Sequence, residues 1–292
     1  TLSANTFIMH AEDVTVTVNF TPEPQYAIHY ELNGGTQNNN NPSTFYPSIG
    51  VPSFAAPWRT GYQFNNWYGN NNFTGDPITS IAPGTTGEQW LYARWTANTY
   101  NVAFNANGGT GTMEPQTHTY DASQALTSNA FTRTGYAFSH WATNPDGTGT
   151  TYTNGQTVQN LTTSNGVTIT LYAQWNPITY TVSFNANGGT GTMAGQTHTY
   201  DASQALTSNA FTRTGYTFAG WATTATGNVA YTNGQTVSNL ASTQGANVEL
   251  FAKWTPITYT VSFNANGGEG TMAAQTHTYD ASQALTSNAF TR

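Results

Sequence analysis

The sequence repeats itself, and the period of the repeat limits how the chain can fold. The stretch FNANGG is followed by TGTM in two copies and by EGTM in a third, at residues 104–113, 184–193 and 263–272. With a diverged copy, YAIHYELNGG, the repeated stretches begin at four tyrosines that define a first to a fourth copy: Tyr26, Tyr100, Tyr180 and Tyr259. The last three starts are 80 and 79 residues apart. Because solenoid units are only roughly 20–50 residues long, each copy is predicted to be a small domain with its own core.

Alternation of apolar and polar residues predicts four strands in a complete copy. In the second copy they are YNVAFNAN, MEPQTHTYD, GYAFSHWAT and VTITLYAQW, at residues 100–107, 113–121, 135–143 and 167–175. The NGG that ends the first strand supplies the positive φ of a tight turn. Asp121 is predicted to cap a short helical turn with Gln124 at the capping-box position, so the fold class is mainly β, or α+β. Short linkers, stiffened by Pro177 and Pro256, predict an elongated rod of modules.

Composition argues against several classes of function. Only 7% of the residues are charged, against about 25% in a typical soluble domain, yet 14% are aromatic, which is ample for cores. Six Lys and Arg and a net charge of -7 argue against nucleic-acid binding, which needs clustered cations. No apolar run approaches the ~20 residues that cross a bilayer, so we predict no direct membrane insertion. The absence of cysteine and the high Thr and Asn content suit a bacterial or archaeal surface protein.

The repeated stretch QTHTYDAS places histidine, aspartate and serine close together, and in the second copy these are His118, Asp121 and Ser123. A hydrolase interpretation is rejected because the members of a catalytic triad come from distant chain positions. A strand histidine and an aspartate in a turn account for the pattern. One histidine and one aspartate per copy also fall short of the three or four ligands that zinc takes. We therefore predict no catalytic residue, no cofactor and no metal site.

Three motifs together carry a resemblance to a known family. They are an opening V.FNANGG, a GYxFxxW stretch in FTRTGYAFSHWAT and FTRTGYTFAGWAT, and a closing LYARW, LYAQW or LFAKW. Through them nearly the whole chain from Tyr26 onward resembles the Listeria–Bacteroides repeat family, which includes the B-repeats of internalin-type surface proteins. The resemblance implies small β-grasp-like modules that are secreted and displayed in tandem on bacterial surfaces. It brings no catalytic residues with it.

The resemblance also suggests how the chain is divided. FIMHAEDVTVTVNF (Phe7–Phe20) resembles the closing strand of a related module, so residues 1–24 are expected to end a preceding module. Three whole modules are expected at 25–98, 99–178 and 179–257, the first of them divergent, and 258–292 opens a further one. Either the sequence is a window on a longer repeat protein, or the last segment of one subunit is completed by the first segment of the next.

The predicted function is a non-enzymatic stalk or adhesin segment of a bacterial cell-surface protein, located outside the cell. Its partners would be neighbouring repeats or other copies of itself. Two alternatives stay open: a filament subunit assembled head-to-tail through its two terminal half-modules, and a module that binds surface glycans or host proteins. Ester crosslinks between Thr and Gln also stay open, whereas a repeated lysine-based crosslink is excluded because Lys253 is the single lysine.

One set of tryptophans recurs in every complete copy. In GYAFSHW, Tyr136 and Phe138 share one face of a regular strand and Trp141 falls on the other. An exposed ring there would stack on sugars, but a bulge or a second packed face would bury it, and burial is the interpretation we favour for Trp141 and its equivalents Trp67 and Trp221.

The binding alternative instead points to residues peculiar to the first module. Trp58 and Trp90 occur only there, and so does the long polar loop 36–54. The candidate ligand or interface contacts are Trp58, Trp90, Phe45 and Tyr46. Candidate glycosylation sites of the N-x-[ST] type are Asn72 and Asn160.

Overall fold

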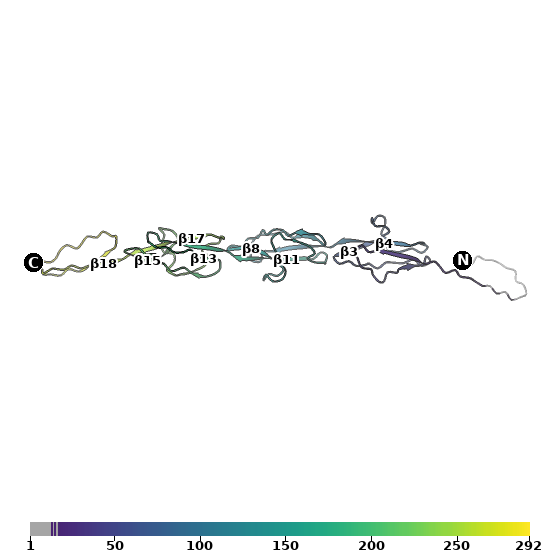
Figure 1. Ribbon diagram of the computed structural model, residues 1–292, viewed down its shortest axis with the longest axis horizontal. Coiled ribbons are helices and arrows are strands. Elements are labelled where there is room, and N and C mark those ends of the chain that lie inside the picture. The colour runs from purple at the N-terminus through teal and green to yellow at the C-terminus, as the bar shows by residue number, and fades with distance from the viewer. Residues whose placement is uncertain (1–12, 14, 16) are drawn as a thin grey trace. The chain divides into compact units, whose positions relative to one another are not determined.

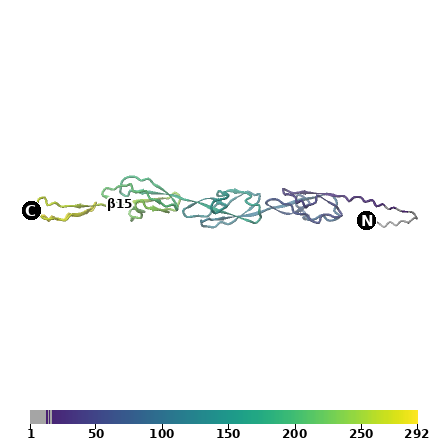
Figure 2. The same ribbon diagram turned by 90° about the horizontal axis from the view of Figure 1, so that it is seen from below.

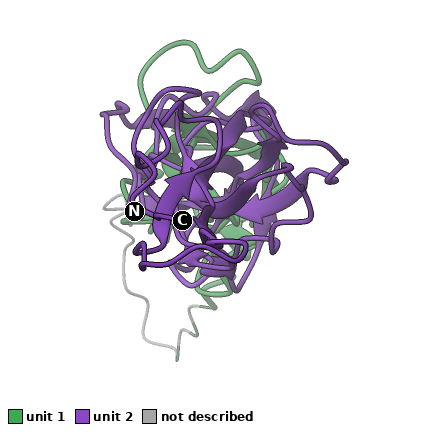
Figure 3. Ribbon diagram, turned by 90° about the vertical axis from the view of Figure 1, so that its left-hand side faces the viewer, with its two compact units in different colours: residues 1–100, 118–122, 159–167 green, residues 101–117, 123–158, 168–292 purple. Residues whose placement is uncertain are grey.

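The structure, a computed structural model, describes residues 13, 15 and 17–292. Within these residues every regular element is a β-strand and none is a helix. The chain divides into two compact units, coloured separately in Figure 3: residues 1–100, 118–122 and 159–167 form one, and residues 101–117, 123–158 and 168–292 form the other. The predicted closing strand at Phe7–Phe20 lies in large part outside the described residues.

The first copy forms a four-stranded sheet, in which β3 and β4 are labelled in Figure 1. Its strands are β1 (Tyr26–Glu31), β2 (Thr44–Phe45), β3 (Tyr62–Tyr68) and β4 (Gln89–Ala97), in the spatial order β2-β1-β4-β3. The central strands β1 and β4 run parallel, and the outer pairs are antiparallel. The first and last strands of the copy therefore pair with each other, so the sheet cannot form until the whole copy is present.

The second and third sheets repeat this order. The second contains β5 (Thr99–Asn105), β6 (Gln116–Thr119), β8 (Tyr136–Ala142), β9 (Thr151–Tyr152) and β11 (Thr168–Pro177), in the order β6-β5-β11-β8-β9. The third, whose outer strand β15 is labelled in Figure 2, contains β12 (Thr179–Asn185), β13 (Gln196–Thr199), β15 (Tyr216–Ala222) and β17 (Asn247–Pro256), in the order β13-β12-β17-β15.

Two-stranded ladders complete the fold. Two of them are β7 (Gln124–Ala125) with β10 (Thr157–Val158) and β14 (Gln204–Ala205) with β16 (Thr236–Val237). In the fourth copy, β18 (Thr258–Val261) pairs with β19 (Gln275–Thr278).

The NGG turn and the closing tryptophan of each copy explain each other. In the second copy, Asn107 and Gly108 have φ of 47° and 88°, which confirms the predicted positive-φ turn. A Cβ on Gly109 would lie 2.7 Å from Cζ2 of Trp175, so the second glycine is required by the indole ring beside it. The same indole donates its N–H to the carbonyl of Ala106 at 2.9 Å, which fixes the ring over the turn.

A β-bulge turns the repeated tryptophans into the core. In the second sheet Trp175 pairs with Phe138 and Gln174 with His140, so Ser139 is an extra residue in β8. The extra residue brings Trp141 to the same side as Phe138, with ring centroids 5.0 Å apart. Equivalent register shifts occur in the other two sheets, and all three tryptophans are buried. The predicted burial is confirmed, and its cause is the bulge.

The predicted helical turn is wrong, and with it the α+β class. Asp121 has a φ of 61°, a left-handed conformation that cannot begin a right-handed helix. Its carboxylate accepts hydrogen bonds from side chains of other segments and does not cap its own chain. The chain then continues as strand β7, which starts at Gln124. The described part of the protein is all-β.

Candidate functional site

The contacts that link the first two copies centre on one residue between two strands. Asn98 lies between β4 and β5 and is buried. Its backbone N–H donates to the carbonyl of Gly61 at 2.9 Å, and its own carbonyl accepts from the N–H of Tyr120 at 2.8 Å. The linker is therefore one residue long and is hydrogen-bonded to both copies.

A ring-on-glycine contact lies beside this linker. Gly61 has a φ of 77°, and a Cβ built on it would overlap the ring of Tyr120. Tyr120 also meets the ring of Tyr62 edge-on, with centroids 5.8 Å apart. Only glycine satisfies both the backbone conformation and the close approach of the ring.

A three-residue hydrogen-bond network closes the same contact. The Tyr62 hydroxyl donates to Oδ2 of Asp121 at 2.8 Å, and Nδ2 of Asn160 donates to Oδ1 at 2.8 Å. Both bonds hold the pKa of the Asp121 carboxyl below its ordinary value, and the bond from Asn160 has the larger effect. The bond to Asp121 raises the pKa of Tyr62. The guanidinium of Arg59 lies 3.6 Å from the Tyr62 ring centroid, on its face.

These contacts recur twice further along the chain, except that among the described residues the asparagine-to-aspartate bond recurs only once, and we call the three sets the first, second and third junctions. The tyrosine-to-aspartate bond is 2.7 Å in the second junction and 2.9 Å in the third. In both, a Cβ built on the glycine would overlap a tyrosine ring. In both, one linker residue is also hydrogen-bonded to the copies on either side. The residues are Gly135, Tyr136, Ile178, Tyr200, Asp201 and Asn239 in the second junction, and Gly215, Tyr216, Ile257, Tyr279 and Asp280 in the third.

Sequence analysis did not identify the junction residues. The sequence feature that could have identified them is the 21-residue stretch that is identical at 116–136 and 196–216. That stretch begins near the TYD sequence that receives the previous copy and ends at the GY sequence that meets the next.

The residues of the QTHTYDAS stretch are not assembled as a catalytic triad. His118 is fully buried and stacks on Tyr100 with ring centroids 5.5 Å apart. Neither of its ring nitrogens has a hydrogen-bond partner among the described residues. Asp121 is instead engaged in the first junction. Among the described residues, no group of three or more His, Asp or Glu is placed to hold a metal ion.

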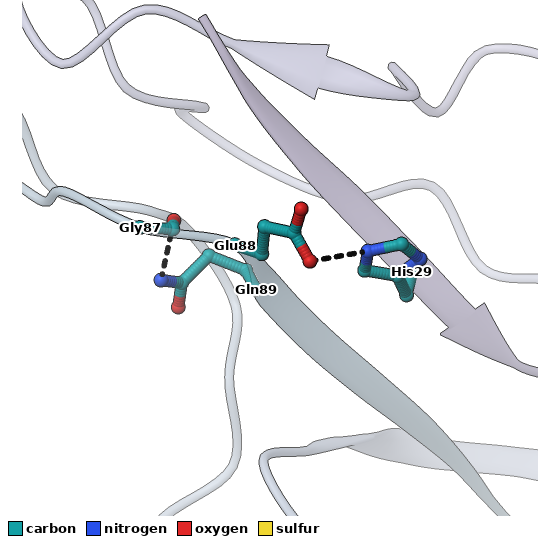
Figure 4. A network of polar contacts seen from close by, with 4 residues as sticks. All are labelled: His29, Gly87, Glu88 and Gln89. Atoms are coloured by element: carbon teal, nitrogen blue, oxygen red, sulfur yellow. Dashed lines mark hydrogen bonds and ion pairs between the residues drawn. The ribbon is translucent and has the colours of Figure 1, made fainter.

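Trp90 lies on the exposed face of the first sheet in a row of rings. It is 45% exposed and stacks on His29, with centroids 4.3 Å apart and planes 19° apart. Tyr92 follows at 6.5 Å on the same strand. Nε2 of His29 lies 3.1 Å from Oε2 of Glu88, as Figure 4 shows. The register places Thr170 and Glu249 where the second and third sheets would have this tryptophan.

The other three candidate contacts lie in different surroundings. Trp58 is 60% exposed and its backbone pairs with Thr36. Tyr46 is 42% exposed, whereas Phe45 is only 3% exposed and belongs to the core. Phe45 pairs with Tyr26 as His198 pairs with Tyr180, so it is the first copy's counterpart of the buried histidine. Burial thus limits Phe45 to the floor of the shallow pocket, of about 380 Å³, that Tyr46 and Ile49 also line.

The two candidate glycosylation sites differ in what their side chains do. Asn72 is exposed in the loop after β3. Asn160 is exposed too, but its amide both donates to the Asp121 carboxylate and accepts from the Asp121 N–H, at 2.8 and 2.6 Å. A glycan on Asn160 would therefore compete with the first junction, whereas one on Asn72 would not.

Comparison with known sequences agrees with this repeated architecture. The sequence model of the Listeria-Bacteroides repeat domain matches four successive segments, at residues 26–94, 100–174, 180–253 and 259–292. The chain belongs to the Listeria-Bacteroides repeat family. The four matches begin at the tyrosines that open the four copies, and each complete match ends within the last strand of its sheet.

Two proteins of Evansella cellulosilytica are similar to this member of the family. One, named "Putative Gly-rich membrane protein", is 32% identical over 221 residues, covering 72% of this chain and 24% of that protein. The other, named "Putative membrane protein", is 27% identical over 168 residues, covering 56% of this chain and 23% of that protein. The chain thus spans about a quarter of the length of these curated relatives. Among its described residues, no helix has the length and apolar character that crossing a bilayer requires.

Proposed function

We propose that this chain is a non-enzymatic spacer, a stalk segment of a bacterial cell-surface protein that acts outside the cell. Membership of the repeat family and the names of the two Evansella relatives support a place in the cell envelope. The observation that carries the spacer role is the junction, which occurs three times with the same tyrosine-to-aspartate bond and the same contact of a tyrosine ring with a glycine. Such contacts restrict the hinge between copies, and a restricted hinge is what gives a stalk its reach.

The same proposal includes the shape and division of the chain. In each of the three larger sheets the first and last strands of the copy run parallel at the centre, and this arrangement supports a β-grasp-like module. We take each copy as one such module, with boundaries at 25–98, 99–178, 179–257 and 258–292, joined in an elongated rod, and 1–24 as the end of a preceding module.

Small-angle X-ray scattering tests the spacer role. The variant replaces Tyr120, Tyr200 and Tyr279 with serine, which removes one ring from each junction. We expect the unmodified chain to keep one maximum dimension across protein and salt concentrations, because it carries few charges to be screened. The variant should show a shorter and broader distribution of distances. A control replaces Ser128, Ser208 and Ser287, which make no junction contact, with alanine. Identical scattering from all three proteins would refute the proposal.

The filament alternative stays a second proposal, in which β18, paired with β19 in the described part of the chain, takes a further strand from another subunit. Negative-stain electron microscopy across a concentration series distinguishes the two roles. Filaments with a regular axial repeat would favour assembly, and separate particles at every concentration would favour the spacer.

A further inference from the structure

The first copy contains a pocket of about 380 Å³ at the end of its sheet. Its lining includes two arginines, two amides and three aromatic rings: Arg59, Arg94, Asn33, Asn71, Tyr62, Phe73 and Trp95. This volume is near the lower end of the roughly 300–1,000 Å³ found for small-molecule sites, so it suits a single ring and not an extended ligand.

The pocket is open because one loop of the first copy does not cover the sheet end. In the second and third copies the turn asparagine donates both to the last strand and to the loop after the bulged strand. Asn107 binds Ala173 and Pro145, at 2.9 and 2.8 Å. Asn187 binds Ala252 and Ala225, both at 2.9 Å. Within the described residues of the first copy, the side-chain amide of Asn33 donates only to the carbonyl of Ala93 on the strand, at 2.9 Å.

The loop of the first copy is folded on itself instead. Asn70 donates to the carbonyl of Thr74 at 2.9 Å and accepts from the N–H groups of Asn72 and Thr74. Phe73, at a φ of 55°, packs edge-on against Tyr68. The loop therefore holds its shape without bonding to Asn33, and the pocket is part of the folded copy.

Both arginines are positioned but lack an anionic partner. Arg59 donates to the carbonyl of Asn33 at 2.9 Å and lies over the Tyr62 ring. Arg94 lies 5.8 Å from the Tyr68 ring and 5.9 Å from the Phe73 ring. Among the described residues the single ion pair is that of His29 and Glu88, so neither arginine is in direct contact with a carboxylate, although the charge of Arg59 acts on Asp121. Two of the six cations of a chain with a net charge of -7 thus face one pocket.

We propose that this pocket binds a sugar ring that carries a carboxylate, of the uronic-acid type. A guanidinium binds a carboxylate through paired, charge-assisted hydrogen bonds, which suits the two arginines. The amide of Asn33 provides polar partners for ring hydroxyls, and the rings of Tyr62, Phe73 and Trp95 provide apolar walls for the C–H face. The site belongs to the first copy, because the second copy has Gln174 and the third Lys253 where the first has Arg94. The proposal is independent of the spacer role.

Isothermal titration and ligand-observed NMR with D-glucuronate test the site on the whole chain. The variant is Arg94→Gln, which installs the residue of the second copy and should leave the thermal unfolding curve unchanged. The matched control is Lys253→Gln, which removes the same charge from the third copy. D-Glucose serves as the neutral sugar, and acetate and inorganic phosphate serve as anions without a sugar.

We expect glucuronate to bind the unmodified chain and the control equally, and the Arg94 variant about tenfold more weakly or worse. Glucose, acetate and phosphate should each bind more weakly than glucuronate. No binding of glucuronate, equal binding by glucose, or equal binding by the Arg94 variant would overturn the proposal. Equal binding of acetate or phosphate would overturn the sugar assignment. None of these binding results bears on the X-ray scattering experiment, so the spacer role and the binding site are tested separately.

Discussion

Acid should destabilise the second and third copies, and their buried histidines are the reason. His118 and His198 are fully buried, each stacks on a tyrosine, and no ring nitrogen of either has a hydrogen-bond partner in the described residues. Burial lowers the pKa of both. The first copy has Phe45 at the equivalent position, so it provides an internal reference and shows that the site accepts a phenyl ring.

The sign and size of the effect follow from proton linkage. An unfolded histidine has a pKa near 6.5, so below that pH the unfolded chain takes up a proton that the folded copy excludes. The free energy of unfolding is therefore greatest above about pH 7.5 and falls as the pH drops below about 6.5. Linkage limits the loss between pH 7.5 and pH 5 to about 2 kcal/mol per histidine, which would be reached only by a ring that takes up no proton in the folded state. We expect a loss in this direction that does not exceed this limit for either histidine.

Urea unfolding at the two pH values, followed by tryptophan fluorescence, measures this loss. The test variant carries His118→Phe and His198→Phe together, after the pattern of Phe45. It should lose most of the pH dependence that the unmodified chain has between about pH 7.5 and pH 5. A control with His140→Gln, which changes a histidine outside the core, should keep that dependence. If the double variant and the unmodified chain lose the same stability in acid, the buried rings are not the cause.

Three further predictions concern the second junction, the core and a partly buried hydroxyl. Gly135→Ala should destabilise the chain by about 2–5 kcal/mol in the same urea assay, because it combines a left-handed backbone with overlap of the Tyr200 ring. Gly155→Ala, at a similar φ but with no atom of the described residues nearer to the new Cβ than Oγ of Ser128 at 3.5 Å, should cost about 1–2 kcal/mol. Tyr200→Ala should reverse part of the first loss, and equal losses at the two glycines would contradict the junction contact. Trp141→Ala should cost about 3–5 kcal/mol, and a loss below about 1 kcal/mol would contradict its burial. Burial raises the pKa of Tyr30 to about 12, so the difference between the spectroscopic titrations of the unmodified chain and of Tyr30→Phe should show one phenol that ionises near pH 12.

Local patterns predicted the strands well, because the alternation of apolar and polar residues in a strand lies within a few neighbouring positions. The stretch 100–107 became β5, and 167–175 lies almost wholly in β11. The NGG turn was predictable for the same reason. The alternation alone places Trp141 on the face opposite Phe138. The structure places both rings on one face, because Ser139 is unpaired and reverses the alternation, and the sequence pattern does not show which residue is unpaired. Asp121 was misread because its partners, Tyr62 and Asn160, are far from it in the sequence.

The candidate site was predictable only in part, again for reasons of distance along the chain. The uniqueness of Trp58 and Trp90 to the first copy directed attention to it, and both are exposed. Phe45 was chosen because it lies in a polar loop, and its core position emerges only from the pairing with Tyr26. The arginine pocket was not foreseen, because it depends on a long-range difference between copies. The Asn33 side chain lacks the bond to the loop after the bulged strand that Asn107 and Asn187 make.

The copies keep their junctions alike while their exposed faces differ, and this contrast indicates how the chain divides its tasks. Tyr62, Tyr136 and Tyr216 all donate to an aspartate of the next copy, so this bond is common to the three junctions. On the exposed sheet face, by contrast, the register aligns Trp90 with Thr170, and at the sheet end it aligns Arg94 with Gln174. A junction constrains its residues from both sides, since a change in one copy must suit the copy beside it. A sheet face is constrained only by solvent and by whatever it binds. A repeat of this kind can therefore acquire a binding surface in one copy without altering the connection that holds it in line.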